Sequence, residues 1–89
     1  MEAAIAGYRK ALETDPEYAL AWNGLSIAYR NQGALDEAIE AALRLVEIEP
    51  DDPLSHTNLS ILYQQKGMIA EAEDAAARAS QLQAATGSS

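Results

Sequence analysis

The sequence predicts an all-α protein in which antiparallel helix hairpins stack side by side as an α-solenoid. The first observation is that apolar residues recur at helical spacing between a few proline and glycine residues. The second is that the segment GALDEAIEA at residues 33–41 returns as GMIAEAEDA at residues 67–75, which is 34 residues later. A period of this length is typical of a helix hairpin that covers its apolar face with a neighbouring copy of itself.

The helices are expected near residues 2–14, 18–32, 35–48, 53–66 and 69–83, in the order of the chain. The first ends before Pro16. The second ends before Gly33, which suits the left-handed conformation that follows a helix, because glycine has no Cβ. The third begins after Ala34 and places its apolar residues in one stripe, with its charged residues on the other side.

The fourth helix has the clearest start, because Asp52 is a suitable N-cap and Pro53 occupies the first helical position, where its missing N–H costs nothing. Gly67 is expected to end this helix in the same way as Gly33. Ala34 and Met68 are poor caps, so the starts of the third and fifth helices are expected to depend on packing. After the fifth helix, residues 86–89 are expected to form a flexible tail.

The period divides one domain, residues 1–85, into a half repeat at 1–16, a repeat at 17–50 and a repeat at 51–84. The two full repeats share residues at Leu20/Leu54, Leu25/Leu59, Ser26/Ser60, Ile27/Ile61, Tyr29/Tyr63, Gly33/Gly67, Glu37/Glu71, Ala38/Ala72, Ala41/Ala75, Ala42/Ala76 and Arg44/Arg78. The half repeat corresponds to the second half of a unit, since its Ala4, Glu13 and Pro16 return at Ala38, Glu47 and Pro50.

Composition excludes several classes of function. The net charge is −8, from 14 acidic and 6 basic residues, which argues against binding to nucleic acid or to anionic membrane surfaces. The chain has no cysteine, so disulfides and thiol chemistry are excluded. No stretch approaches the ~20 apolar residues of a membrane span, and the first residues do not resemble a signal peptide. A cytoplasmic setting is therefore expected.

The residues of each unit resemble the tetratricopeptide repeat (TPR) family. The family pattern is met by Trp22, Leu25, Ser26, Tyr29, Gly33, Ala38 and Pro50, and in the next unit by His56, Leu59, Ser60, Tyr63, Gly67 and Ala72. The chain departs from the family at His56 and Ala84, which replace an aromatic residue and a proline, and at Ala42 and Ala76, which replace a large aromatic residue. The two alanines suggest tight helix packing. The resemblance implies a right-handed α-solenoid of about two and a half TPR units (five helices) whose first helices line a concave groove.

The second helix has two apolar sides. One side is expected to pack within its hairpin and carries Trp22, Leu25 and Tyr29. By the resemblance, the other side faces the groove, and its predicted ligand-groove residues are Leu20, Asn23, Ile27, Arg30 and Asn31, with Leu54, Thr57, Ile61, Gln64 and Gln65 as their counterparts. For Ile27 and Ile61, two alternatives stay open, because isoleucine can either reach the groove or pack beneath its floor.

The remaining features predict no chemistry. His56 is the only histidine and has no cysteine partner, so no metal site is expected, and it is interpreted as a polar-tipped substitute for tryptophan at the hairpin surface. The acids Glu47, Glu49, Asp51 and Asp52 are interpreted as a solvated connector. No nucleophile–base pair or phosphate loop is present, so no catalytic residue, cofactor or enzyme activity is expected.

Three functions remain open. The leading one is a protein-binding scaffold whose partner is a protein or peptide, neutral or basic, with apolar anchors. Recognition of an acidic carboxyl-terminal tail is disfavoured, because Arg30 is the only base near the groove row. The second is self-association as a homodimer, or contact with an upstream segment, through an uncovered strip at Ile5, Tyr8 and Leu12 in the first helix. The third is a regulatory fragment of a larger protein.

Overall fold

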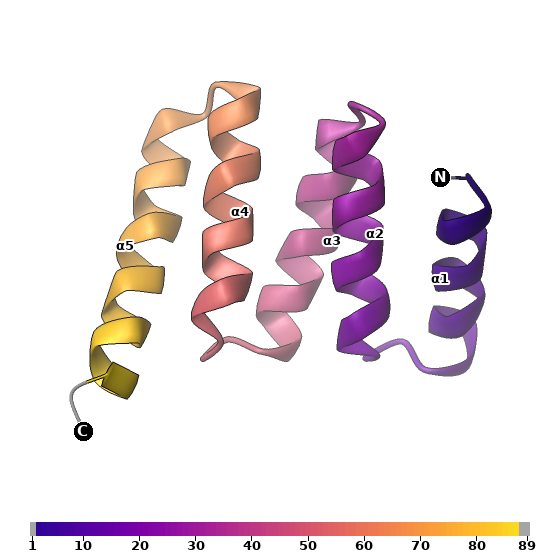
Figure 1. Ribbon diagram of the computed structural model, residues 1–89, viewed down its shortest axis with the longest axis horizontal. Coiled ribbons are helices and arrows are strands. Elements are labelled where there is room, and N and C mark those ends of the chain that lie inside the picture. The colour runs from indigo at the N-terminus through magenta and orange to yellow at the C-terminus, as the bar shows by residue number, and fades with distance from the viewer. Residues whose placement is uncertain (1, 88–89) are drawn as a thin grey trace.

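The computed structural model describes residues 2–87, and over this range the chain forms α-helices joined by short connectors (Figure 1). The helices are α1 (Glu2–Thr14), α2 (Ala19–Asn31), α3 (Leu35–Ile48), α4 (Pro53–Lys66) and α5 (Ile69–Gly87). The described residues contain no strand. The predicted all-α solenoid of helix hairpins is therefore confirmed, and most predicted helix ends lie within one residue of those observed.

The turns follow the local chemistry of the sequence. Gly33 and Gly67 adopt φ values of +80° and +87°, the left-handed conformation predicted for both. The Asp52 carboxylate accepts a hydrogen bond from the Leu54 backbone N–H at 3.0 Å, so it caps α4 as expected. Ala34 caps α3 without a side-chain hydrogen bond, which leaves packing to hold the start of that helix.

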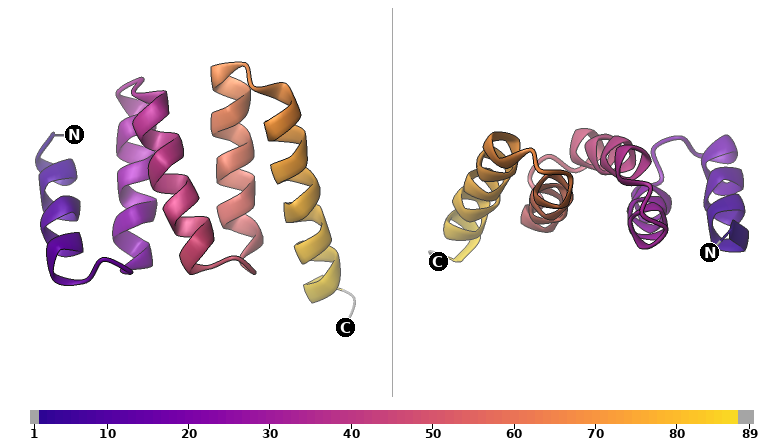
Figure 2. Two further views of the ribbon diagram at one scale, coloured as in Figure 1. Left: turned by 180° about the vertical axis from the view of Figure 1, so that it is seen from behind. Right: turned by 90° about the horizontal axis from the view of Figure 1, so that it is seen from above.

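The hairpins form a thin curved layer. α2 pairs with α3 and α4 pairs with α5, while α1 packs against α2 at one end of the row. The molecule measures 39 × 30 × 15 Å, so it is only about two helices thick. Seen from above, α2 and α4 lie on one side of the layer and α3 lies on the other (Figure 2). The first helix of each hairpin therefore contributes to the same face.

The core lies where α3, α4 and α5 meet. Its buried residues include Ala38, Ala42, Leu59, Leu62 and Ala75, with Tyr63 packed against them. Ala42 is fully buried, as expected from its replacement of a larger residue, because a methyl side chain allows a neighbouring helix to approach closely. The same expectation for Ala76 is wrong, because Ala76 is exposed. By contrast, no described side chain of α1 is fully buried. Packing is thus looser at α1 than in the helices that follow it.

The fifth helix is longer than predicted. α5 continues to Gly87 rather than ending at residue 83, because residues 77–86 contain good helix formers and no proline or glycine to stop it. Residues 86 and 87 of the expected tail are therefore helical, and residues 88–89 lie outside the described residues. Glu73 and Ser80 are exposed, although their counterparts Ile39 and Val46 are buried or half-buried. The stripe that would cover a further hairpin is therefore polar.

Candidate functional site

Four large aliphatic side chains project from the side of the layer formed by α2 and α4. Leu20 and Leu54 are 66% and 69% exposed, and Ile27 and Ile61 are each 38% exposed. Residues seven positions apart lie on one side of a helix, so each helix presents one such pair along its length. Because both isoleucines retain more than a third of their surface, they reach solvent rather than lying beneath a floor.

These side chains belong to a surface that we call the α2–α4 groove. It is defined by Leu20, Asn23, Ile27, Leu54, Thr57 and Ile61, which are six of the residues predicted from the sequence. At the end of the groove where α2 and α4 begin lies a cavity of ≈ 280 Å³. We call it the basal cavity, and it is lined by Ala19, Leu20, Asn23, Leu45, Glu49, Asp52, Leu54 and Ser55. The structure thus brings Leu20, Asn23 and Leu54 together as neighbours.

Two acidic residues that were not predicted as groove residues line the basal cavity. Glu49 and Asp52 were interpreted as part of a solvated connector, but both lie on the cavity wall. The connector returns the chain to the start of α4, which is the same end of the groove as Leu54. Asp52 is held in place because its Oδ1 accepts the Leu54 N–H. Its position two residues before Leu54 was the signal that could have identified it.

The other predicted groove residues do not line the basal cavity. Asn31, Gln64 and Gln65 are exposed near the far ends of α2 and α4, and Arg30 is half-buried there. The Thr57 hydroxyl donates to the Pro53 carbonyl at 3.0 Å, so its proton is used within α4. Asn31, Gln64 and Gln65 thus offer side-chain amide groups where α2 and α4 end, whereas apolar and acidic groups surround the basal cavity where these helices begin.

The residues predicted for self-association lie differently from expectation. Ile5, Tyr8 and Leu12 are half-buried, so the strip is not uncovered. The Tyr8 ring sits directly on Gly24 of α2, where an added Cβ would lie 2.3 Å from the Tyr8 Cζ. The strip corresponds to the one by which α3 packs on α4, and α2 covers it in the same way. Self-association through these residues stays a prediction.

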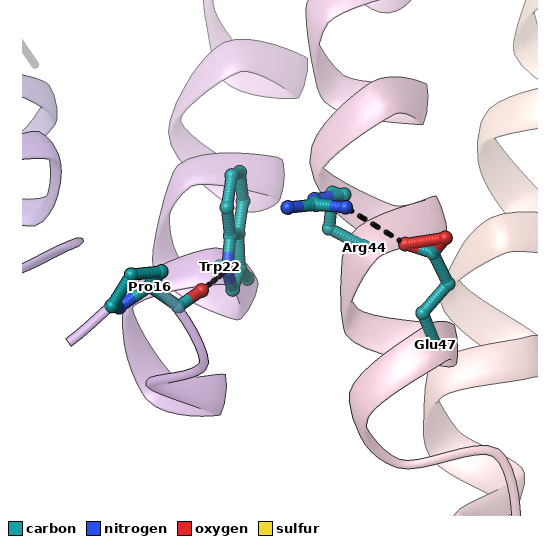
Figure 3. A network of polar contacts seen from close by, with 4 residues as sticks. All are labelled: Pro16, Trp22, Arg44 and Glu47. Carbon is teal, nitrogen blue, oxygen red and sulfur yellow. Dashed lines mark hydrogen bonds and ion pairs between the residues drawn. The ribbon is translucent and has the colours of Figure 1, made fainter.

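Trp22 is half-buried rather than part of the closed core. Figure 3 shows its ring between Pro16 and Arg44. Its indole Nε1 donates to the Pro16 carbonyl at 2.8 Å, which ties the connector before α2 to that helix. On the other side, the Arg44 guanidinium lies 5.5 Å from the ring centroid, within the range of a cation–π contact. Arg44 is itself paired with Glu47 at 3.1 Å. The ring therefore connects three segments at the surface of the layer.

His56 repeats the contact of Trp22 one unit later, but at a different depth. Its Nε2 lies 2.9 Å from the Pro50 carbonyl, which is the counterpart of Pro16. The expectation that His56 lies at the hairpin surface is wrong, because the residue is only 8% exposed. An imidazole is smaller than an indole and fits beneath the neighbouring side chains while it keeps the same hydrogen bond.

Within residues 2–87, no group of three or more histidine, cysteine, aspartate or glutamate residues is arranged to hold a metal ion. Over the same range, none of the helices combines the length and the apolar character needed to cross a bilayer.

Comparisons with known proteins identify both the repeat and the fold. The family model for the tetratricopeptide repeat matches residues 2–53. Among curated proteins, none matches the sequence. The solved structure titled "Crystal structure of MamA" is 26% identical, with a TM-score of 0.94 over 99% of this chain and 52% of that chain. The structure titled "MamA MSR-1 C2" is 25% identical, with a TM-score of 0.90 over 96% of this chain and 49% of that chain.

A third structure, titled "Crystal structure of MamA protein", is 28% identical, with a TM-score of 0.87 over 92% of this chain and 45% of that chain. The chain therefore spans about half the length of the solved proteins that it matches. Over the matched residues, the fold of this chain therefore follows the fold of each of these structures closely.

Proposed function

The chain belongs to the tetratricopeptide repeat family, and from that membership we propose that it is a non-catalytic module that binds a peptide segment of a partner protein in the α2–α4 groove. Modules of this fold are typically protein-interaction scaffolds rather than enzymes. The proposal also retains the cytoplasmic setting expected from the sequence.

The exposure of Leu20, Ile27, Leu54 and Ile61 is the observation that carries this proposal. Fully burying an aliphatic side chain of this size contributes about 1.5–3 kcal/mol, so covering four partly exposed ones supplies a useful driving force. Only two helices contribute to the row, so the contact area is small. The cost of immobilising a partner then limits the affinity to about micromolar.

The charges around the groove favour a neutral or basic partner. Glu49 and Asp52 lie on the wall of the basal cavity beside Leu20 and Leu54. A peptide that places an aliphatic side chain between the two leucines would bring a neighbouring lysine or arginine close to these carboxylates. The net charge of −8 adds a longer-range attraction, which speeds association and weakens as salt is added.

A peptide library displayed on phage tests the proposal. We expect selection on the wild-type protein at low salt to enrich segments that combine aliphatic anchors with lysine or arginine. The strongest peptide is then synthesised and titrated by calorimetry. In the double variant Ile27→Lys/Ile61→Lys we expect at least a tenfold loss of affinity, with the helical circular dichroism unchanged, because both side chains already reach solvent.

The matched control is Leu43→Lys, which replaces a side chain of similar exposure (42%) on α3, outside the groove. This variant should bind the peptide as the wild-type protein does, apart from the small effect of one added charge. A double variant that stays folded and binds with full affinity would place the ligand elsewhere. Enrichment of acidic peptides would contradict the proposed charge preference.

A further inference from the structure

A second cavity lies on the other side of α2 from the groove. Its volume is ≈ 420 Å³, larger than that of the basal cavity, and α1, α2 and α3 all line it. We call it the α1–α3 pocket. Its α2 residues are Trp22, Leu25 and Tyr29, which lie about 160° around the helix from the groove residues at 3.6 residues per turn. A ligand in this pocket would therefore not compete for the groove surface.

The walls of the α1–α3 pocket are apolar and its neighbouring polar groups already have partners. Leu12, Trp22 and Leu25 supply aliphatic and aromatic surface. The Trp22 N–H is used by the Pro16 carbonyl. The Tyr29 hydroxyl accepts hydrogen bonds from Arg9, including one from Nε at 3.1 Å. The pocket thus offers surface for an apolar body.

The rim of the pocket is acidic. Glu13, Glu37 and Glu40 line it, and all three are exposed. Among the residues that the structure describes, none of the three is in an ion pair. Arg9 is the one base in the lining, and it is directed to Tyr29, with its guanidinium 5.8 Å from that ring. Apolar walls beneath unpaired carboxylates complement a cation with an apolar stem.

The second full repeat provides an internal comparison. There, Val46 occupies the position of Leu12 and packs against the core cluster, against which both Tyr29 and its counterpart Tyr63 also pack. His56 occupies the position of Trp22 and is buried. The equivalent surface therefore has a buried imidazole where the first repeat has the half-buried indole of Trp22. The combination of Leu12 with a half-buried Trp22 in the lining is therefore particular to the first repeat.

We propose that the α1–α3 pocket binds an arginine or lysine side chain of a basic peptide segment, on the face of the layer opposite the groove. The alkyl stem of such a side chain packs against Leu12 and Leu25, and its charged end reaches Glu37 and Glu40. Aromatic rings attract guanidinium groups, and the contact of Arg44 with Trp22 shows this pairing within the protein.

Trp22 is the only tryptophan, so its fluorescence reports directly on this pocket. The probe is the peptide Ac-Ala-Leu-Arg-Leu-Ala-NH2, and its neutral counterpart carries citrulline in place of arginine. We expect the arginine peptide to change the Trp22 emission with saturation at low salt and a Kd of about 0.1–1 mM, since one side chain supplies most of the contact. The citrulline peptide should give no saturable change.

Two double variants separate local recognition from general attraction. Glu37→Gln/Glu40→Gln should weaken binding about fivefold, from two partly screened charge pairs. Its matched control is Glu71→Gln/Asp74→Asn, which removes the same charge at the equivalent exposed positions of α5. The control should change the affinity less than twofold. Equal weakening by both variants would overturn the proposal, because it would show attraction by net charge alone.

A third variant tests whether the pocket is independent of the groove. Leu20→Asn/Leu54→Asn removes two apolar groove side chains without a change in charge, and we expect it to leave the fluorescence titration unchanged. Loss of the Trp22 response in this variant would place the peptide in the groove and overturn the second site. Calorimetric binding of the arginine peptide with unchanged Trp22 emission, or equal binding of the citrulline peptide, would also overturn it.

Discussion

The packing of Tyr8 on Gly24 predicts that one substitution changes sign between two backgrounds. An alanine Cβ at position 24 would lie 2.3 Å from the Tyr8 Cζ and 2.6 Å from both ε carbons. Carbon atoms in contact are normally about 3.5–4.0 Å apart, so the ring would have to move by about 1 Å or more. Overpacking of this kind costs about 1–3 kcal/mol of folding free energy.

Replacing a glycine inside a helix also has a favourable effect, of about 1 kcal/mol. For Gly24→Ala in the wild-type protein we therefore expect a net loss of about 0–2 kcal/mol. In the Tyr8→Ala background the clash is absent, so the same substitution should stabilise the protein by about 1 kcal/mol. The predicted coupling between the two positions is about 1–3 kcal/mol, as found for residues in direct contact.

Urea denaturation followed by circular dichroism at 222 nm measures the four members of this cycle. Gly7→Ala is the matched control, because Gly7 also lies inside a helix but has nothing within 4 Å of its would-be Cβ. It should stabilise both backgrounds by about 1 kcal/mol. If Gly24→Ala stabilised the wild-type protein as much as Gly7→Ala does, Tyr8 would not pack on Gly24, and the description of the α1–α2 contact would be incorrect.

Four further stability predictions use the same assay. Trp22→Ala should lower the free energy of unfolding by about 3 kcal/mol, which is at the low end for a large aromatic residue because Trp22 is only half-buried. A change below about 1 kcal/mol would show that the contacts of Trp22 are unimportant for stability. His56→Ala should cost about 1–3 kcal/mol, since it removes a buried ring and its hydrogen bond, so the two variants should differ little. Asp52→Ala should cost about 0.5–2 kcal/mol because it removes the N-cap of α4, whereas Asp52→Asn should be nearly neutral because asparagine also caps helices. Equal effects of the two substitutions would show that Asp52 does not act as a cap. Gly67→Ala should cost about 1–2 kcal/mol, because alanine is strained at its positive φ, and a stabilised variant would contradict that geometry.

The fold could be predicted because local and periodic signals agree along the chain. Gly33 and Gly67 each end a helix in the left-handed conformation, and Asp52 with Pro53 starts one, so these boundaries are set by the residues themselves. The 34-residue period required neighbouring hairpins. The end of α5 was not predictable in this way, because no proline or glycine interrupts its last turns before Gly87.

The groove could be predicted in part and the pocket could not. The spacing of Leu20 and Ile27 identified a helix face, and the structure shows that this face is exposed. The depths of Trp22 and His56 depend on which helix packs beside each one, namely α1 in the first case and α3 in the second. The sequence pattern does not predict how closely the neighbouring helix approaches each of these rings. For the same reason, the placement of Glu49 beside the groove became evident only from the path of its connector.

The central claim is that a partner segment lies along the α2–α4 groove, and intermolecular NMR contacts test it most directly. The protein is labelled at its isoleucine and leucine methyl groups and mixed with the strongest peptide selected from the library. We predict nuclear Overhauser effects from the peptide to Leu20, Ile27, Leu54 and Ile61, and none to the matched surface residue Leu43. Contacts confined to Leu12 and Leu25, or to Ile5 of α1, would contradict the claim and show that the bound segment lies outside the groove.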